Sequence, residues 1–347
     1  MREQIRTLAS GAVLLLITGW ILHVGKDVFV PIVFSIFAVY VIGGLARLLG
    51  KVPFLGPRLP PRIRYALAMA VIAVVMVEVV YLVIASKDAV AGFAPKFQEL
   101  LLAATQRFAA YFQIESEPNW TTLRRELVAQ IDVQKFIGQM FASVSSIIVG
   151  IELVLLYAGF MLWEHRMLLA KLAKLSDPRD FARMRKVFDL VNVRIGSYLA
   201  VKTFLGMLLG ALSWIAMAFV GLEFAAFWSV LIALLNFIPY FGAALGIAFA
   251  VAMAIVQFAS PGAVLAVMLP LVAIHVFVEY FLNSYLMGKS LDLGPLAILA
   301  SLTIWSELWG IPGAFLAIPI TALMRIVFAE FASTRPIAVL LSGNGRL

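Results

Sequence analysis

The stretch between Glu223 and Glu279 most constrains how this chain can fold, because it contains no Asp, Glu, Lys or Arg. Its middle, Asn236-Phe237-Ile238-Pro239-Tyr240-Phe241-Gly242, interrupts an otherwise continuous apolar run. A second apolar stretch, from Leu293 to Leu323, is interrupted in the same way at Trp309-Gly310-Ile311-Pro312-Gly313. Apolar runs of this length are typical of membrane helices. Transporters use such interruptions to expose backbone groups to a solute.

The composition places the whole chain in the membrane class. Of its 347 residues, 63% are hydrophobic and only 13% are charged, which is far more apolar than a soluble domain. Short alternating strands, the signature of a membrane β-barrel, are not visible. The sequence therefore predicts an all-α polytopic membrane protein. Since there is no Cys, disulfides and Cys-based metal sites are excluded.

The charged loops predict a topology of six to eight transmembrane helices. The net charge of +8 comes largely from loops beside apolar spans, which indicates cytoplasmic loops rather than nucleic-acid binding. Both termini are expected in the cytoplasm. Each broken segment either crosses once, giving eight spans, or forms a re-entrant hairpin, giving six. The expected segments are spans one to three (1–86), an outer amphipathic helical insert (87–135), span four (136–163), a basic cytoplasmic helical loop (164–196), a transport core (197–330) and a tail (331–347).

Two loop helices are expected from apolar periodicity. In the outer insert, Phe97 begins a series of apolar residues at steps of three and four, which is typical of an amphipathic helix. In the basic loop, Asp177 and Pro178 form a helix start. Apolar residues then follow on one side as far as Val191 and Ile195. We expect this second helix to lie along the cytoplasmic membrane surface.

The two breaks are the first candidate functional site. A helix broken within the bilayer leaves backbone groups without partners, and only protein or a water-filled cavity can cover them. Freed carbonyl groups could hold a cation, and positive half-helix ends could hold an anion or a polar solute. The alternative is a pair of proline kinks that serve packing alone. The pathway residues predicted at the breaks are Asn236, Pro239, Gly242, Gly310, Pro312 and Gly313.

Ionisable residues within the spans are the second candidate, because such residues usually face a cavity. Glu279 and Asn283 are one helical turn apart, and His275 precedes Glu279 by four residues, so the three share one helix face. With Glu307, this row predicts a proton or cation relay. Alternatively, Glu279 lies near the interface and extends to water. Three weaker candidates are Glu78, Glu152 and Lys202, the last able to reach the cytoplasmic face. Five tryptophans are predicted mainly as interface anchors: Trp163, Trp214, Trp228, Trp305 and Trp309. Alternatively, Trp305 and Trp309, one turn apart beside Glu307, line a pathway.

Enzyme signatures are absent from the sequence. There is no His-Glu-x-x-His, no phosphate-binding loop and no Gly-x-Ser-x-Gly motif. The chain has only three His residues, which makes a His-rich metal site implausible. We therefore expect no enzyme activity, no cofactor and no metal, and transport without a built-in nucleotide drive.

The last 150 residues or so resemble the autoinducer-2 exporter family of bacterial permease-like proteins. The resemblance rests on the motif at the first break, on Met287-Gly288-Lys289-Ser290-Leu291 followed by Pro295, and on the run from Trp305 to Ala322. Ser284 stands where the family commonly has a Pro. The resemblance implies a bacterial inner-membrane transporter that forms a homo-oligomer, with pentamers found in the family. Some members are linked to export of a quorum-sensing signal and others to sodium–proton exchange.

Three functions follow from these observations. The first is a gradient-driven secondary transporter or exporter of a small polar solute such as a quorum-sensing signal, bound where the two broken segments meet. The second is a Na⁺(Li⁺)/H⁺ antiporter on the same scaffold. The third is a non-transporting membrane scaffold that recruits other proteins through the outer insert and the basic helix. The partners expected are the lipid bilayer, a small polar solute or a monovalent cation or proton, and further copies of the chain, with no nucleic acid.

Overall fold

The protein is helical throughout the part described by the computed structural model. That part comprises residues 2–51, 58–92, 150–164, 177–258, 260–287 and 291–345, with residues 95, 99, 167, 171 and 173–175. The one β-contact among these residues is an antiparallel bridge between Leu293 and Ser342. Five helical stretches are long and apolar enough to cross a membrane, and three shorter apolar helices accompany them. The predicted all-α polytopic membrane fold is therefore confirmed.

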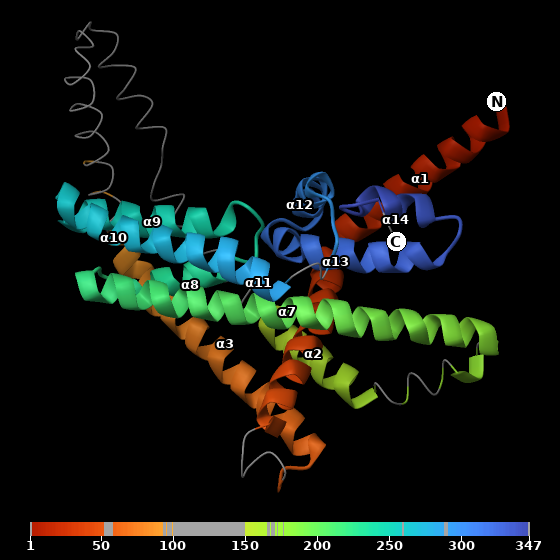
Figure 1. The fold of residues 1–347 in the computed structure, drawn as a ribbon, viewed down its shortest axis with the longest axis horizontal. Helices are drawn as coiled ribbons and strands as arrows, with labels where there is room; N and C mark the ends of the chain where they lie inside the picture. Colours follow the sequence, from red (N-terminus) through yellow and green to blue (C-terminus); the bar gives the residue numbers. More distant parts are fainter. Residues whose placement is uncertain are drawn as a thin grey trace, which may run out of the picture. The chain divides into compact units, whose positions relative to one another are not determined.

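The first three helices follow the predicted apolar runs (Figure 1). Helix α1 (Arg2–Val24) and helix α2 (Lys26–Lys51) are separated only by Gly25, and α3 (Pro61–Gly92) follows the basic loop. Helix α3 extends beyond the predicted end of span three at Ser86. Lys87 and Asp88 are compatible with a helix, and the first residue disfavoured there is Gly92 itself. Apart from the end of α3 and residues 95 and 99, the predicted outer insert lies outside the described residues.

Helix α7 (Pro178–Val220) is one uninterrupted helix of 43 residues. It begins as predicted, because the N–H of Phe181 donates to the carbonyl of Asp177 at 2.8 Å. It does not end near residue 196, where the basic loop was expected to give way to span five. Val191 and Ile195 are buried against α2 and α13 (Ile311–Glu330). The expectation of a separate helix on the membrane surface is therefore wrong, since its apolar side packs against protein.

The second half of the chain consists of shorter helices. They are α8 (Ala225–Leu235), α9 (Gly242–Phe258), α10 (Pro261–Val276), the π-helix η2 (Phe277–Leu282), α11 (Asn283–Met287), α12 (Pro295–Trp309), α13 and α14 (Arg335–Leu341). Helix α8 packs against α9, α9 against α10, α12 against α13, and α13 against α14. Each predicted break therefore separates two helices that pack on each other.

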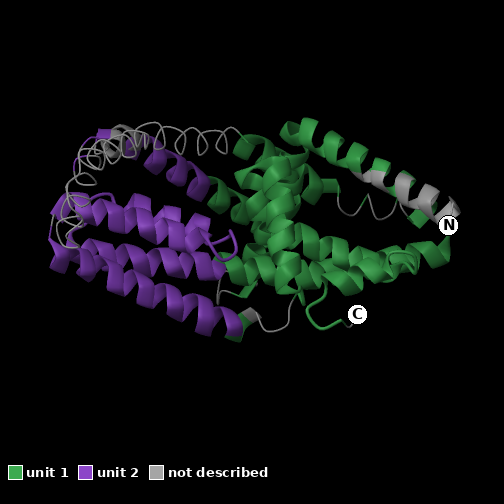
Figure 2. Ribbon diagram, turned by 90° about the horizontal axis from the view of Figure 1, so that it is seen from above, with its two compact units in different colours: residues 1–73, 149–203, 285–347 green, residues 74–148, 204–284 purple. Residues whose placement is uncertain are grey.

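The chain divides into two compact units (Figure 2). Unit 1 comprises residues 1–73, 149–203 and 285–347, and unit 2 comprises residues 74–148 and 204–284. The core of unit 1 joins Phe37 of α2, Ile195 and Tyr198 of α7, and Leu316 and Ile320 of α13. Fully buried side chains of unit 2 include Leu209 of α7, Ile232 of α8, Ala250 of α9 and Leu271 of α10. The first break belongs to unit 2 and the second to unit 1.

Candidate functional site

The first break is a tight turn at residues 236–241 that reverses the chain. The N–H of Ile238 donates to the carbonyl of Leu235 at 2.8 Å, and the N–H of Gly242 donates to the carbonyl of Ile238 at 3.2 Å. A Cβ placed on Gly246 of α9 would lie 2.9 Å from the Cα of Ile232 of α8. Helices α8 and α9 therefore lie against each other as a helical hairpin, and a single kinked span does not describe this break.

The second break reverses the chain in the same way. Gly310 has φ 67° and ψ −142°, a combination that is essentially restricted to glycine. Its N–H donates to the carbonyl of Ser306 at 2.7 Å, and its carbonyl accepts from the N–H of Ala314 at 3.1 Å. A Cβ on Gly313 would lie only 1.8 Å from the carbonyl oxygen of Trp305. The α12–α13 hairpin therefore needs glycine both at its tip and in its close contact.

The tip of the second hairpin is bound to the end of α1, which the sequence did not predict. The Nε1 of Trp309 donates to the carbonyl of Leu22 at 2.9 Å, and His23 Nδ1 lies 3.1 Å from the carbonyl oxygen of Leu308. The rings of Trp305 and Trp309 are 5.0 Å apart. These contacts fix the peptide next to Glu307 against α1. Trp309 is buried, so its predicted role as a lipid-facing anchor is wrong.

The row His275, Glu279 and Asn283 lies in unit 2 and is partly turned inward. Each side chain is half-buried, and one polar atom of each is enclosed: His275 Nδ1, Glu279 Oε2 and Asn283 Oδ1. The regular α-helical spacing predicted for this row is not present, because η2 intervenes. The N–H of Asn283 donates to the carbonyl of Val278, five residues back. Such π-helical turns occur frequently at functional sites.

The other predicted ionisable residues are placed differently. Glu307 is exposed on α12, and Glu78 and Glu152 are exposed as well. Lys202 is only 6% exposed, so it does not extend along the surface to the cytoplasmic face as its alternative interpretation required. Among the tryptophans, Trp163 is 84% exposed, as an anchor should be, whereas Trp228 is 5% exposed. An anchoring role is therefore also wrong for Trp228.

A buried ion pair is the main feature that the sequence reasoning missed. Arg325 Nη2 lies 2.6 Å from Asp292 Oδ2, and Arg325 Nη1 donates to the carbonyl of Leu291 at 3.1 Å. Arg325 lies within α13 and is only 4% exposed. An arginine in an apolar helix was the available signal, because such a charge requires a partner. The pair ties the segment before α12 to α13.

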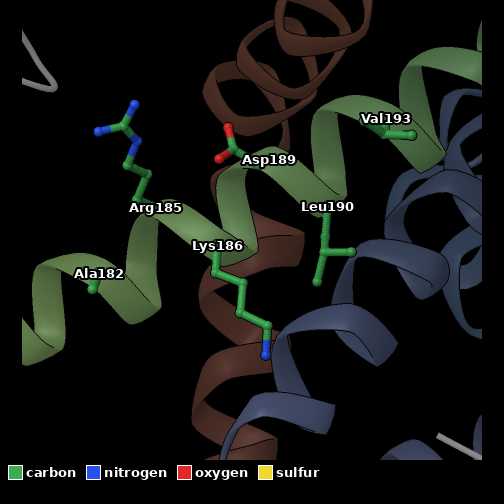
Figure 3. A pocket seen from close by; sticks show the side chains of 6 residues that line it. All are labelled: Ala182, Arg185, Lys186, Asp189, Leu190 and Val193. Carbon is green, nitrogen blue, oxygen red and sulfur yellow. The ribbon is translucent and has the colours of Figure 1, made fainter.

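A surface hollow of about 530 Å³ lies along the first half of α7. It is lined by Ala182, Arg185, Lys186, Asp189, Leu190 and Val193. Figure 3 shows Lys186 and Leu190 pointing to one side of the helix, and Arg185 and Asp189 to the other. Lys186 forms an ion pair with Glu330 at the end of α13, with 3.1 Å between Nζ and Oε1. Among the described residues, no three His, Asp or Glu side chains are grouped so that they could hold a metal ion.

Comparison with known proteins gives consistent matches. The family model described as AI-2E family transporter matches residues 11–333. The AI-2 transport protein TqsA of Escherichia coli (strain K12) is 22% identical over 96% of this chain and 94% of its own length. The provisionally named transport protein YhhT of the same strain is 23% identical over 94% and 90%. A provisionally named transport protein of Borreliella burgdorferi is 28% identical over 61% of this chain and 59% of its own length, so that match covers about three fifths of each protein.

Proposed function

The chain belongs to the AI-2E family of transporters, and we propose that it is a secondary transporter that exports a small polar solute. It is a multi-pass protein of the bacterial inner membrane, where the transporter family and its apolar helices place it. One relative is named as an AI-2 transport protein, and a quorum-sensing signal of this kind is the solute that we propose. The transporter works as a homo-oligomer, such as a pentamer, with both termini in the cytoplasm.

The observation that carries this proposal is the pair of broken helical hairpins. Backbone that leaves the helical conformation at membrane depth is tolerated only where protein or a polar pathway covers it. Here the chain breaks twice, at residues 236–241 and at Gly310, and each break is held by glycine packed directly on a backbone carbonyl. Interrupted helices of this kind hold substrates in other secondary transporters. Asn236, Pro239, Gly242, Gly310, Pro312 and Gly313 are the residues that we assign to the pathway.

An ion gradient supplies the energy in this proposal, because the sequence has no nucleotide-binding motif. Glu279 couples the ion. His275 and Asn283 lie near it on the same continuous helical stretch of α10, η2 and α11. One polar atom of each of the three side chains is enclosed, which suits a site that exchanges a proton or a monovalent cation. Glu307 is the second coupling residue. It is next to the peptide that His23 fixes, so a change in its charge acts directly beside the second break.

The test uses purified protein in liposomes that contain a pH-sensitive dye. An inward solute gradient of AI-2, or a pulse of Na⁺ or Li⁺, is applied to wild type, Glu279→Gln and Glu307→Gln. We expect a proton signal in wild type and its loss in both variants, because glutamine cannot exchange a proton. Glu223→Gln is the control, since this exposed acid lies in the turn before α8, outside the predicted relay. Equal signals in wild type and in both variants would exclude the coupling roles.

A second candidate function is Na⁺(Li⁺)/H⁺ exchange on the same scaffold. The arrangement of Glu279 with the amide oxygen of Asn283 favours it, because carboxylate and amide oxygens are ligands for hard cations. The two functions differ in a single outcome of the same assay. A proton signal driven by Na⁺ or Li⁺ alone, without organic solute, supports cation exchange, whereas a signal that requires AI-2 supports solute export.

A further inference from the structure

We propose that the hollow along the first half of α7 binds the headgroup phosphate of an anionic phospholipid. In this site Arg185 and Lys186 hold the phosphate, while Leu190 and Val193 contact the upper part of the acyl chains. The site involves neither of the two breaks and none of the coupling residues, so it stands independently of the proposed transport function.

The hollow occupies one continuous face of α7. Each of its lining residues lies three or four positions from at least two others in the set of Ala182, Arg185, Lys186, Asp189, Leu190 and Val193. Residues at these spacings are neighbours on a helix surface. Val191 and Ile195, which are buried against α2 and α13, are each two residues from Val193 and therefore point to another side. The side of α7 that packs on protein is thus distinct from the side that carries the hollow.

The hollow lies where α7 leaves the bilayer. The helix has no charged residue from Thr203 to Val220, and Lys202 is covered by protein, since it is only 6% exposed. Toward the start of the helix, the first exposed charged residue is Arg194. Its neighbour Val193, at the end of the hollow, is an apolar residue that is 66% exposed. The change from an apolar to a charged exposed surface therefore falls at the end of the hollow that is nearer the membrane.

The polarity of the lining changes along the helix in the order that a phospholipid requires. Leu190 and Val193 are nearer the apolar half of α7, and Arg185 and Lys186 are farther from it. Leu190 is four to five residues from the two basic residues, which is about 6–8 Å at 1.5 Å per residue. The headgroup layer on one side of a bilayer is about 5–8 Å thick. A lipid with its acyl chains against Leu190 therefore brings its phosphate to the level of the two basic side chains.

The charge around the hollow favours an anion. From Pro178 to Arg194, α7 carries five Lys and Arg residues against two Asp residues. Arg185 forms no ion pair with another residue that the structure describes. Lys186 pairs with Glu330, yet its ammonium group has three donors, so it retains donors for a phosphate. The acid in the lining is Asp189, which lies on the same side of the helix as Arg185 (Figure 3) and opposes an anion there.

The test follows lipid binding at the hollow in the purified full-length protein. Because the chain has no native Cys, a bimane label can be attached through Asn192→Cys, an exposed position beside the hollow. The labelled protein in detergent is titrated with phosphatidylglycerol or phosphatidylcholine, each carrying a nitroxide on the same acyl chain, which quenches the label on contact. We expect saturable quenching by phosphatidylglycerol at about one tenth of the concentration that phosphatidylcholine requires, because basic residues attract the anionic headgroup.

Two matched pairs of variants separate the site from the general charge of the helix. Arg185→Gln should raise the half-saturating concentration of phosphatidylglycerol about fivefold, because it removes a charge-assisted contact to the phosphate. Arg183→Gln removes the same charge from an exposed position outside the lining and should change that concentration less than about twofold. Asp189→Asn should lower it about threefold by removing the repulsion, whereas Asp180→Asn, also exposed and outside the lining, should leave it within about twofold.

The inference is overturned if phosphatidylglycerol quenches no better than phosphatidylcholine. It is also overturned if Arg183→Gln weakens binding as much as Arg185→Gln, since the attraction would then belong to the whole helix. Tighter binding by Asp189→Asn supports the site with a variant that must be folded to bind. Excess soluble glycerol phosphate should leave the quenching unchanged, and full displacement by it would assign the hollow to a soluble phosphate compound instead of a lipid. Proton flux plays no part in this readout, so either proposal can fail without the other.

Discussion

Gly242 and Gly313 occupy equivalent places in the two hairpins, in the first turn of the second helix. A Cβ on Gly242 would lie 1.7 Å from the carbonyl oxygen of Leu235, and one on Gly313 would lie 1.8 Å from that of Trp305. Each contact involves backbone atoms of a helix end, which cannot move aside as a flexible side chain can. Close packing at the two breaks therefore depends on the absence of a single methyl group.

Gly313→Ala is expected to lower the free energy of unfolding by about 1–3 kcal/mol, the usual cost of overpacking. Denaturant titration of the purified protein in detergent measures this change. The matched control is Gly44→Ala in α2, where a Cβ would meet nothing within 4 Å and helix propensity favours alanine. An unchanged midpoint for Gly313→Ala, equal to that of Gly44→Ala, would show that the hairpin relaxes without cost.

Individual residues also mark the limits of sequence reasoning. The acids and the Pro/Gly breaks could be identified because their residue types are unusual in apolar helices. The burial of individual side chains could not be predicted from the sequence, because it depends on which helices pack together. Trp228 and Trp163 have the same side chain in similar apolar surroundings, yet one is buried and the other is 84% exposed.

Among the elements, the segment before α12 is held from two sides. Arg325 of α13 binds Asp292 and Leu291, while Gly343 donates its N–H to the carbonyl of Asp292 at 3.0 Å. Leu293 pairs with Ser342 in an antiparallel bridge. These contacts fix where α12 begins, and hence the position of the second break at its other end.

Breaking this buried pair from one side should be costly. Asp292→Leu is expected to lower the free energy of unfolding by about 3–5 kcal/mol, because the guanidinium of Arg325 stays buried without that carboxylate. Arg325→Leu should cost less, since the side chain of Asp292 is 23% exposed and keeps contact with water. The double variant should lose less than the sum of the two, which a double-mutant cycle measures. Glu330→Gln, which breaks the exposed pair with Lys186, should cost at most about 1 kcal/mol. Additive single effects would show that Arg325 and Asp292 do not depend on each other.

At this scale the sequence predicted helices well and their junctions less well. Both breaks could be located from Pro239, Gly242, Gly310 and Pro312, since these residues end helices for local steric reasons. The sequence could not predict that α8 folds back on α9 and α12 on α13, because a kinked helix and a helical hairpin use the same residues. The π-helix around Glu279 left no signal either, because this stretch is apolar on nearly all sides, so a rotation of its faces does not change the sequence pattern.

For the whole molecule, the continuity of α7 has the largest consequence. A helix of 43 residues is about 65 Å long at 1.5 Å per residue, roughly twice the hydrocarbon thickness of a bilayer. Its charged residues all lie between Arg179 and Lys202, and the apolar run from Thr203 to Val220 has none. The basic loop and the fifth span were expected as separate elements because charge changes abruptly between them. No residue there ends a helix, so composition changed while secondary structure did not.

The first half of α7 should therefore extend from the membrane on the cytoplasmic side, as its basic residues indicate. Because the chain has no native Cys, single cysteines can report this with a membrane-impermeant maleimide. In spheroplasts we expect Glu223→Cys to react from outside and Arg183→Cys only after lysis, since both side chains are exposed at opposite ends of the helix. Ala211→Cys, in the apolar half, should react in neither case. Reaction of Arg183→Cys and Glu223→Cys from the same side would mean that α7 does not cross the bilayer. That result would also contradict the placement of both termini in the cytoplasm, which rests on the positive-inside rule.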